Sequence, residues 1–370
     1  MIPSDTAAIK VGFVLLSNSR NPIPSTRIAV LNMFPYLRNM GFDPHIVYEP
    51  DKASDKPDVD GLGARLIGDG FQVVVFQKVG GASVEALAQE LDAAGIRTVF
   101  CVCDFIDVRM ATVTDATVVV TDFLKSLYPE SLQSKIHVIH DGIEHPEIFC
   151  QQASQRRGTF TDRLRAVLVT SVSLEHLPQI GTPPRWLHVT IVGRYAPSHD
   201  VKKRLGQARR KLLRYPDTKQ RFDFLQFFLD PNVRCLAWDP VNVYRHMLDA
   251  DVGIIPINAV ESSANQSEVP SWKVKSENRL SMKMSLGLPV VATPIPSYEP
   301  LIQQGRNGFF ARDRHEWLEH LNTLRDPTVR ERVGKAARES VLQRYSMEEQ
   351  ARLLGNLFRQ LINADSMILL

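Results

Sequence analysis

Short apolar runs alternate with amphipathic segments along the whole chain, and the runs end in polar or glycine-bearing loops. In the first half the runs are Ile9–Leu16, His45–Tyr48, Phe71–Gln77, Thr98–Cys103, Thr117–Val120 and Ile136–Ile139. Apolar runs of about four to eight residues, bounded by turn formers, indicate strands buried on both faces of a parallel sheet. Because helical segments separate the runs, the pattern predicts βαβ units and a doubly wound α/β sheet.

The second half repeats this pattern after a polar stretch that has no periodicity. Its runs are Leu164–Val169, Trp186–Val192, Val233–Leu236, Ala250–Pro256 and Pro289–Ala292. The repeat predicts two Rossmann-like domains, residues 1–145 and residues 163–345, joined by a linker over residues 146–162. An amphipathic helix is expected at 347–363, within a C-terminal segment of residues 346–370.

Residues 275–302 combine a helix, a tight turn, a strand and a loop. Ser276 is a candidate N-cap, and Gly287 suits the end of the helix because glycine adopts positive φ without strain. The apolar side of this helix is expected to be Leu280, Met282, Met284 and Leu286. Thr293 and Pro294 end the strand, so the following loop lies at its carboxyl end, where open α/β sheets bind ligands.

Positive charge gathers at the amino end of that helix. Lys273 and Lys275 precede it, and Arg279 lies in its first turn. A helix N-terminus presents free N–H groups and the positive end of its dipole, so the lysines make the place suited to a diphosphate. The alternative is a solvated basic turn with no ligand.

Loops of the first half also carry candidate chemistry. Ser25 or Thr26 is expected to cap a helix that runs to Met40, and Ser83 is expected to cap a helix over residues 84–94. Asp104 follows the strand at Thr98–Cys103, where a carboxylate can orient a hydroxyl group of a ligand or act as a base. The alternative is an Asx turn or a helix cap.

Composition excludes several classes of protein. Of the 370 residues, 44% are hydrophobic and 23% charged, and the net charge is +3. This balance is ordinary for a globular protein and too weakly basic to indicate nucleic acid, although it permits anionic ligands. The four cysteines lack metal or disulfide spacing, no signal peptide is recognisable, and no run is long enough to span a bilayer. A reduced, cytoplasmic setting is expected.

The second half resembles a known family. Lys275, Asn278, Arg279 and Leu280, followed by the run Gly287–Pro294, resemble the nucleotide-sugar site of GT-B glycosyltransferases, most closely family 4. The resemblance continues through Tyr298–Ile302, Gly305–Phe309 and Arg344–Ser346. It is strong over about residues 250–350, weaker over residues 1–145 and poor over residues 150–235.

This resemblance implies a GT-B fold of two Rossmann-like domains facing across a cleft, with the C-terminal helix returning to the first domain. It also implies transfer of a sugar from a nucleotide-activated donor to an acceptor hydroxyl, with retained anomeric configuration. Without an Asp-x-Asp pair we expect no metal and no cofactor. The expected catalytic residues are Lys275, Glu299 and Asp104. The expected donor-binding residues are Lys273, Ser276, Asn278, Arg279, Gly193, Arg194, Pro294 and Ser297.

Two positions depart from the family pattern. The usual Gly-Arg and Lys-Gly pairs after the first strand of the second domain are replaced by Thr170–Ser173. The paired glutamates, spaced eight apart, would fall on Val274 and Met282. The second glutamate normally holds the nucleotide ribose, and Glu277 and Glu261 are candidates to replace it.

The expected partners are a nucleotide-diphosphate sugar and a glycan, lipid-linked or small-molecule acceptor, with no nucleic acid. The basic run at 201–221 is either a solvated helix face or a contact for anionic lipid at the inner face of a membrane. The long polar loop Asn258–Trp272 has the composition of a lid. Two other functions stay open: a non-catalytic nucleotide-sugar or glycan-binding protein or partner subunit, and a sugar-nucleotide epimerase.

Overall fold

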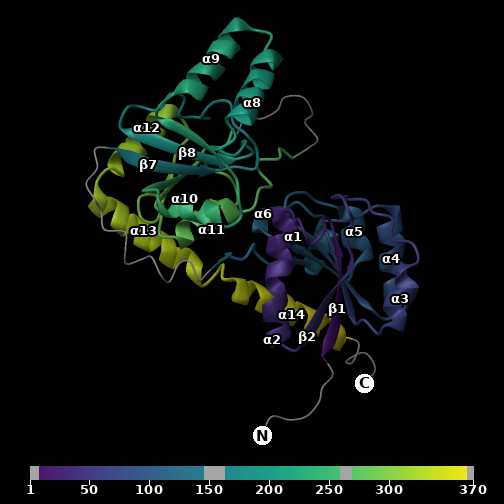
Figure 1. The fold of residues 1–370 in the computed structure, drawn as a ribbon. Coiled ribbons are helices and arrows are strands. Elements are labelled where there is room, and N and C mark those ends of the chain that lie inside the picture. Colours follow the sequence, from purple (N-terminus) through teal and green to yellow (C-terminus); the bar gives the residue numbers. More distant parts are fainter. Residues whose placement is uncertain (1–7, 146–162, 259–268, 365–370) are drawn as a thin grey trace. The chain divides into compact units, whose positions relative to one another are not determined.

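The computed structural model describes residues 8–145, 163–258 and 269–364, which form two compact units. Unit 1 contains the chain up to Glu144, the short segment Lys273–Asn278 and the chain from Arg344 onward. Unit 2 contains His145–Trp272 and Arg279–Gln343. Each unit has its own six-stranded parallel sheet with helices packed against it (Figure 1). The predicted doubly wound α/β architecture is therefore confirmed.

The sheet of unit 1 has the order β2-β1-β3-β4-β5-β6, with every pair parallel. Its strands are β1 (Ile9–Leu15), β2 (Phe42–Tyr48), β3 (Val73–Gln77), β4 (Arg97–Val102), β5 (Ala116–Val119) and β6 (Ile136–Val138). Every residue of β3 is buried, because helices cover both faces of the sheet. This explains why the run shows no alternation of apolar and polar residues.

Two helices of unit 1 differ at their starts from the sequence prediction. The helices of this unit are α1 (Pro24–Ala29), η1 (Leu31–Met33), α2 (Phe34–Asn39), α3 (Leu62–Gly68), α4 (Ala82–Ala93), α5 (Val108–Val113), α6 (Asp122–Ser126) and η2 (Glu130–Lys135). The single helix expected up to Met40 is wrong, because Pro35 cannot donate a helical hydrogen bond and the helix restarts there. The Thr26 hydroxyl does not cap it but donates to Gln77 in the interior. The Ser83 hydroxyl likewise donates to Asp60 instead of capping α4.

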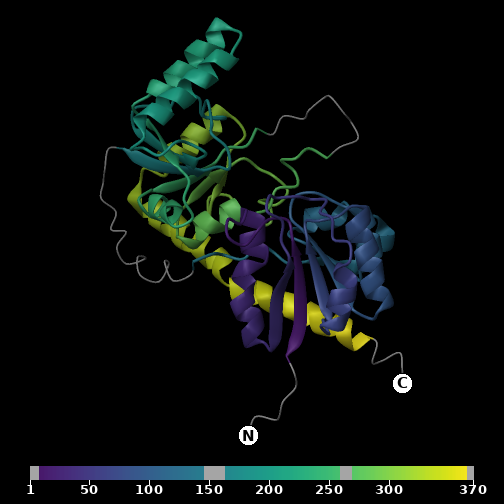
Figure 2. The same cartoon turned by 45° about the vertical axis from the view of Figure 1, so that its right-hand side comes forward.

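The last helix, α14 (Met347–Ala364), completes the core of unit 1, as predicted. Its buried face includes Leu354 and Phe358, which pack with residues of β1 and α2. Gly355 lets the helix approach closely, because an added Cβ would lie 2.6 Å from Met40 Cε and 2.8 Å from a ring carbon of Phe42. The helix crosses beneath the sheet in both views (Figures 1 and 2).

The sheet of unit 2 has the order β12-β11-β10-β7-β8-β9 and is also parallel throughout. Its strands are β7 (Leu164–Val169), β8 (Leu187–Gly193), β9 (Val233–Ala237), β10 (Val252–Ile255), β11 (Val290–Ala292) and β12 (Phe309–Phe310). Its helices are α8 (Val201–Arg214), α9 (Thr218–Leu229), α10 (Asn242–Leu248), α11 (Asn278–Ser285), α12 (Arg314–Thr323) and α13 (Pro327–Leu342). No helix in the described ranges is long and apolar enough to cross a membrane.

The junction of α11 and β11 agrees with its sequence. Gly287 has a φ of 71°, the left-handed conformation that ends many helices. Gly334 of α13 packs directly on it, since an added Cβ there would lie 2.2 Å from the Gly287 carbonyl oxygen. The predicted helix end and the strand after it are confirmed.

Candidate functional site

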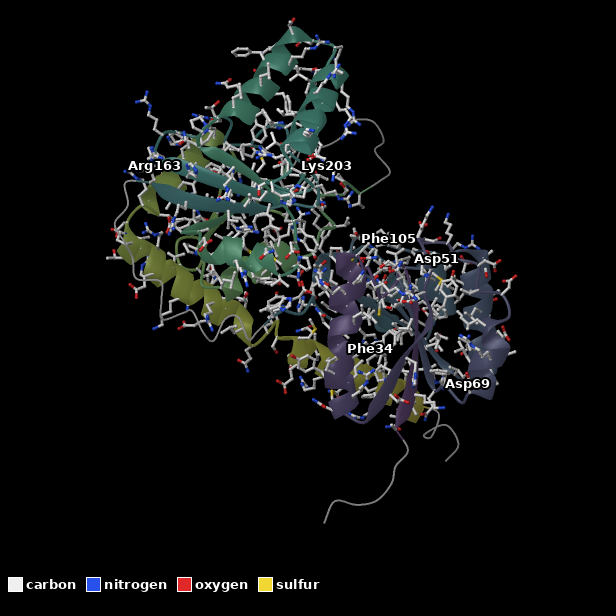
Figure 3. The ribbon with its side chains drawn as sticks, in the orientation of Figure 1. Phe34, Asp51, Asp69, Phe105, Arg163 and Lys203 are labelled. Carbon is white, nitrogen blue, oxygen red and sulfur yellow. The ribbon has the colours of Figure 1, made fainter. Side chains whose placement is uncertain are left out.

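The carboxyl edge of the unit 1 sheet carries an ion pair between Lys78 and Asp104. Lys78 follows β3 with a φ of 56°, a strained conformation for a residue other than glycine. Its Nζ lies 2.7 Å from Asp104 Oδ1. Burial lowers the pKa of Lys78, but Cys103 and Asp104 raise it by more. Lys78 therefore orients the side chain of Asp104, the expected acceptor-side carboxylate. In Figure 3, the labelled residues Phe105 and Asp51 mark this edge of the sheet, and Asp69 marks the opposite edge.

Asp141, which the sequence interpretation did not select, lies at the same edge. Its side chain is buried, and the Ser276 hydroxyl donates a hydrogen bond to it. Burial raises the pKa of Asp141 to about 7, and the nearby Glu277 adds to the rise. A carboxyl group that titrates near neutral pH can both give and accept a proton. The available signal was a carboxylate placed directly after the last apolar run of the domain.

His140 and Glu277 form a buried pair beside Asp141. The Glu277 side chain is 1% exposed, and its Oε1 lies 2.7 Å from His140 Nδ1. The same Nδ1 lies 2.8 Å from the Val120 carbonyl oxygen, so the two acceptors hold the proton on that nitrogen. Burial lowers the pKa of His140, but Glu277 raises it by more. Because Glu277 is engaged here, this placement does not support its suggested contact with ribose.

A cavity opens between these groups in unit 1. Its lining includes Gln77, Lys78, Cys101, Cys103, His140 and Asp141. It contains about 420 Å³ of empty space, counting the part open to solvent. Burial raises the pKa of Cys101 to about 12 and that of Cys103 further, so both are protonated thiols at neutral pH. The cavity joins apolar walls to a few convergent polar groups, as small-molecule sites do.

Lys273, Lys275, Ser276 and Asn278 all lie in the segment that belongs to unit 1. Val274 is buried in the core of that unit and Glu277 pairs with His140, so the chain passes through a turn over residues 271–274 and a bend at Glu277 before the helix. The helix consequently begins at Asn278, and the expected N-cap at Ser276 is wrong. The structure places the Ser276 hydroxyl against Asp141. Lys273 and Lys275, which precede Ser276 in the chain, are half-buried.

In unit 2, Arg279 reaches the loop that follows β7. It lies in the first turn of α11, and its Nη2 donates to Ser171 Oγ over 3.2 Å. This loop is where the family pattern would place its missing cations. Gly193 ends β8 against the same loop, because an added Cβ would lie 2.4 Å from the Val172 carbonyl oxygen, and the Arg194 amide donates to that oxygen. The structure thus brings together Gly193, Arg194 and Arg279.

Next to Arg279 lies a buried lysine that the sequence interpretation missed. Lys283 is fully buried on α11, and its Nζ donates to the Arg279 carbonyl oxygen over 3.1 Å. Gly253 makes room for it, since an added Cβ would lie 2.5 Å from Lys283 Cδ. Burial and the charge of Arg279 lower the pKa of Lys283 to about 7. Of the residues expected on the apolar side, Leu280, Met284 and Leu286 are buried and Met282 is half-buried, because a spacing of two residues does not follow one helical face.

The loop after β11 carries Pro294, Ser297 and Glu299. Ser297 is 4% exposed, and its hydroxyl has no hydrogen-bond partner within the part of the chain that the structure describes. A buried hydroxyl without a partner is costly, so a ligand atom is a plausible partner for it. Glu299 is exposed. The polar loop expected to be a lid, including Glu261, lies largely outside the described residues, as does the linker.

In the described ranges, no group of three or more His, Cys, Asp or Glu residues is placed to hold a metal ion. Unit 1 offers carboxylates beside a lysine, and unit 2 offers cations and a buried hydroxyl.

Comparisons with known proteins concern one segment of the chain and its fold. Residues 257–355 match the family model described as glycosyl transferase-like. No curated protein matches the chain in sequence. Solved structures match over most of the chain at low identity, a likeness that bears on the fold.

A glycosyltransferase from Rickettsia africae is 12% identical with a TM-score of 0.65, and the match covers 96% of this chain and 99% of that one. Sucrose-phosphate synthase from Thermosynechococcus elongatus is 13% identical with a TM-score of 0.63, covering 96% and 99%. HepE of Anabaena, in complex with UDP, is 12% identical with a TM-score of 0.62, covering 95% and 100%. The chain therefore has the GT-B fold of these proteins.

Proposed function

We propose that the protein is a glycosyltransferase that moves a sugar from a nucleotide diphosphate to an acceptor hydroxyl. The observation that carries the proposal is the Arg279 guanidinium on Ser171, at the carboxyl edge of the unit 2 sheet. It supplies a cation at the loop where the family's own cations are missing. The glycosyl transferase-like match over residues 257–355 covers the same segment.

The donor diphosphate binds at the N-terminus of α11. Free N–H groups and the helix dipole attract anions there. Arg279 and Lys275 add charge that stabilises the departing diphosphate, and Lys273 extends the positive potential. The Ser297 hydroxyl donates to the nucleotide sugar, which satisfies its hydrogen-bonding capacity. With these cations in place, the reaction needs no metal.

The acceptor binds to unit 1. Asp104, held by Lys78, orients the acceptor hydroxyl, and Asp141 exchanges a proton near neutral pH. The acceptor is a glycan, a lipid-linked sugar or a small molecule whose polar group fits the cavity lined by Lys78 and Asp141. The proposed stereochemical outcome is retention, as the family resemblance implies.

Nucleotide binding followed by product release tests the proposal. HepE was solved with UDP and with UDP-glucose, so uridine nucleotides are the first ligands for calorimetric titration. Release of UDP from UDP-sugars is then measured with a panel of acceptors, in buffer with and without EDTA. Magnetic resonance of the product gives the anomeric configuration. Loss of activity in EDTA contradicts metal independence, and an inverted product contradicts retention.

The Lys275→Ala variant sharpens this test. We expect turnover to fall at least about tenfold, because one cation near the leaving group is lost, while the unfolding temperature stays unchanged. Lys335→Ala, which removes an exposed lysine of α13, serves as the matched control. Unchanged turnover in Lys275→Ala removes that residue from the mechanism.

A second candidate is a non-catalytic nucleotide-sugar-binding protein. Its support is the position of the residues that replace the paired glutamates. Val274 is buried in the core of unit 1 and Met282 is half-buried on α11. Neither side chain has a carboxyl group that could hold the ribose. UDP binding without release from any UDP-sugar, across all acceptors, favours this candidate over transfer.

A further inference from the structure

The helical hairpin of α8 and α9 concentrates the positive charge of the chain. Residues 201–229 contain nine Lys or Arg and two Asp, a net charge of +7. The whole chain has a net charge of +3, so the remaining residues together carry −4. Both views show the two helices side by side, extending away from the sheet of unit 2, with Lys203 on α8 (Figures 1, 2 and 3).

The α9 helix has apolar residues on two opposite sides. One side attaches it to unit 2: Phe224 is 4% exposed, and Phe227 packs against the core of that unit. The other side presents Phe222, Leu225 and Leu229, which are 66%, 39% and 71% exposed. Their spacing of three and four residues places them on one face of the helix. Phe222 and Leu229 on this face are mostly open to solvent.

The α8 helix adds exposed apolar and basic side chains. Val201, Leu205 and Leu213 are 59%, 57% and 69% exposed, and no residue of α8 is buried. Arg209, Arg210 and Arg214 are also exposed. Exposed apolar patches of this kind mark interaction sites.

We propose that the α8–α9 hairpin docks on an anionic phospholipid membrane. Lysines and arginines attract the negative surface, while Phe222, Leu225 and Leu229 enter the boundary between head groups and acyl chains. The charge selects an anionic partner, and the apolar face of α9 selects a surface with an apolar interior over a nucleic acid. Docking does not depend on the proposed glycosyl transfer, and it requires no helix that spans the membrane.

Vesicle partitioning tests the docking directly. The full-length protein is mixed with vesicles of phosphatidylcholine alone or with added phosphatidylglycerol, and the bound fraction is measured by sedimentation. We expect binding only to the anionic vesicles, weakening as salt is raised. Two hairpin variants separate the electrostatic contribution to binding from the apolar contribution. Arg209→Gln/Arg210→Gln/Arg214→Gln lowers the partition coefficient roughly tenfold to a hundredfold, and Phe222→Ser/Leu229→Ser lowers it about tenfold.

Matched controls keep the result interpretable. Arg20→Gln/Lys52→Gln/Lys335→Gln removes the same charge from exposed sites elsewhere, and Ile67→Ser removes an exposed apolar side chain of α3. All variants change exposed residues, and their thermal unfolding is compared with wild type. The proposal is overturned if wild type binds both vesicles equally, if it binds duplex DNA but no vesicles, or if hairpin variants partition like the controls.

Discussion

The carboxyl edges of the two sheets have the same architecture but opposite buried charge. Unit 1 contains three buried acidic side chains: Asp141 and Glu277 lie together, and Glu144 pairs with Arg27 at 2.7 Å. In unit 2, the described residues include a buried side chain of the opposite sign, Lys283, whose Nζ donates to the Arg279 carbonyl oxygen. One fold therefore provides an edge suited to hydroxyls and protons and an edge suited to anions. The residues after each strand decide the chemistry, and the strands only position them.

The largest expected effect comes from removing the cation of the unit 2 edge. Arg279→Ala should lower kcat/KM for the nucleotide sugar roughly a hundredfold, because one preorganised donor to a developing charge is commonly worth about 3 kcal/mol. Its hydrogen bond to Ser171 is also lost. Steady-state kinetics and UDP titration measure the two consequences.

The control for Arg279→Ala is Arg312→Ala, an exposed arginine before α12. The comparison between the edges fails if both variants bind UDP as wild type does. Arg279 would then hold the Ser171 loop without serving an anion.

The next effect concerns the buried pair of unit 1. Glu277→Ala should destabilise the fold by about 2 kcal/mol at pH 6, the usual size of a hydrogen bond to a charged group. Because the pKa of His140 is raised in the fold, the pair contributes fully below about pH 6.5 and is lost as pH rises through that raised pKa. Chemical denaturation at pH 6 and pH 9 should therefore show a larger cost at the lower pH. Glu339→Ala, an exposed site on α13, should show neither effect.

The sequence predicted best where one element decides the outcome alone. The strand β3 was recognisable because it is a continuous apolar run that ends at Gln77. The helix end at Gly287 was recognisable because a positive φ depends on that residue alone. The helix α14 carries its own amphipathic pattern. The break before α2 was also local, since Pro35 was visible, but the apolar periodicity on both sides of it concealed the interruption.

The sequence failed where a residue depends on a distant partner. The start of α11 is set by Glu277, whose partner His140 comes 137 positions earlier. Lys283 of α11 is buried because Gly253, on strand β10, leaves space for its side chain. Spacing within one segment cannot report either contact, so the expected N-cap at Ser276 and the buried lysine were both misjudged.

A smaller effect should appear on removing the charge of Asp141. Its pKa is raised from 3.8 to about 7, so the unfolded chain loses the proton first and the folded state becomes less stable as pH rises from about 4 to 7. Asp141→Asn cannot ionise and keeps an acceptor for Ser276. Relative to wild type, the variant should gain stability steadily between pH 4 and pH 7.5. An identical pH dependence of unfolding in both proteins contradicts the burial of this carboxyl group.

The smallest effect should come from Lys283→Met, which replaces a buried ammonium by an apolar side chain of similar length. The pKa of Lys283 is lowered to about 7, so the cost of burying its charge is complete below pH 7 and disappears as pH rises toward the unfolded value of 10.5. The variant should therefore be more stable than wild type at pH 6, with little gain at pH 10. Its affinity for UDP should fall, because the anion-binding edge loses a charge beneath Arg279. A gain in stability with unchanged UDP binding would show that the opposite charge of the two edges is incidental to the ligand, whereas Lys335→Met at an exposed site should change neither quantity.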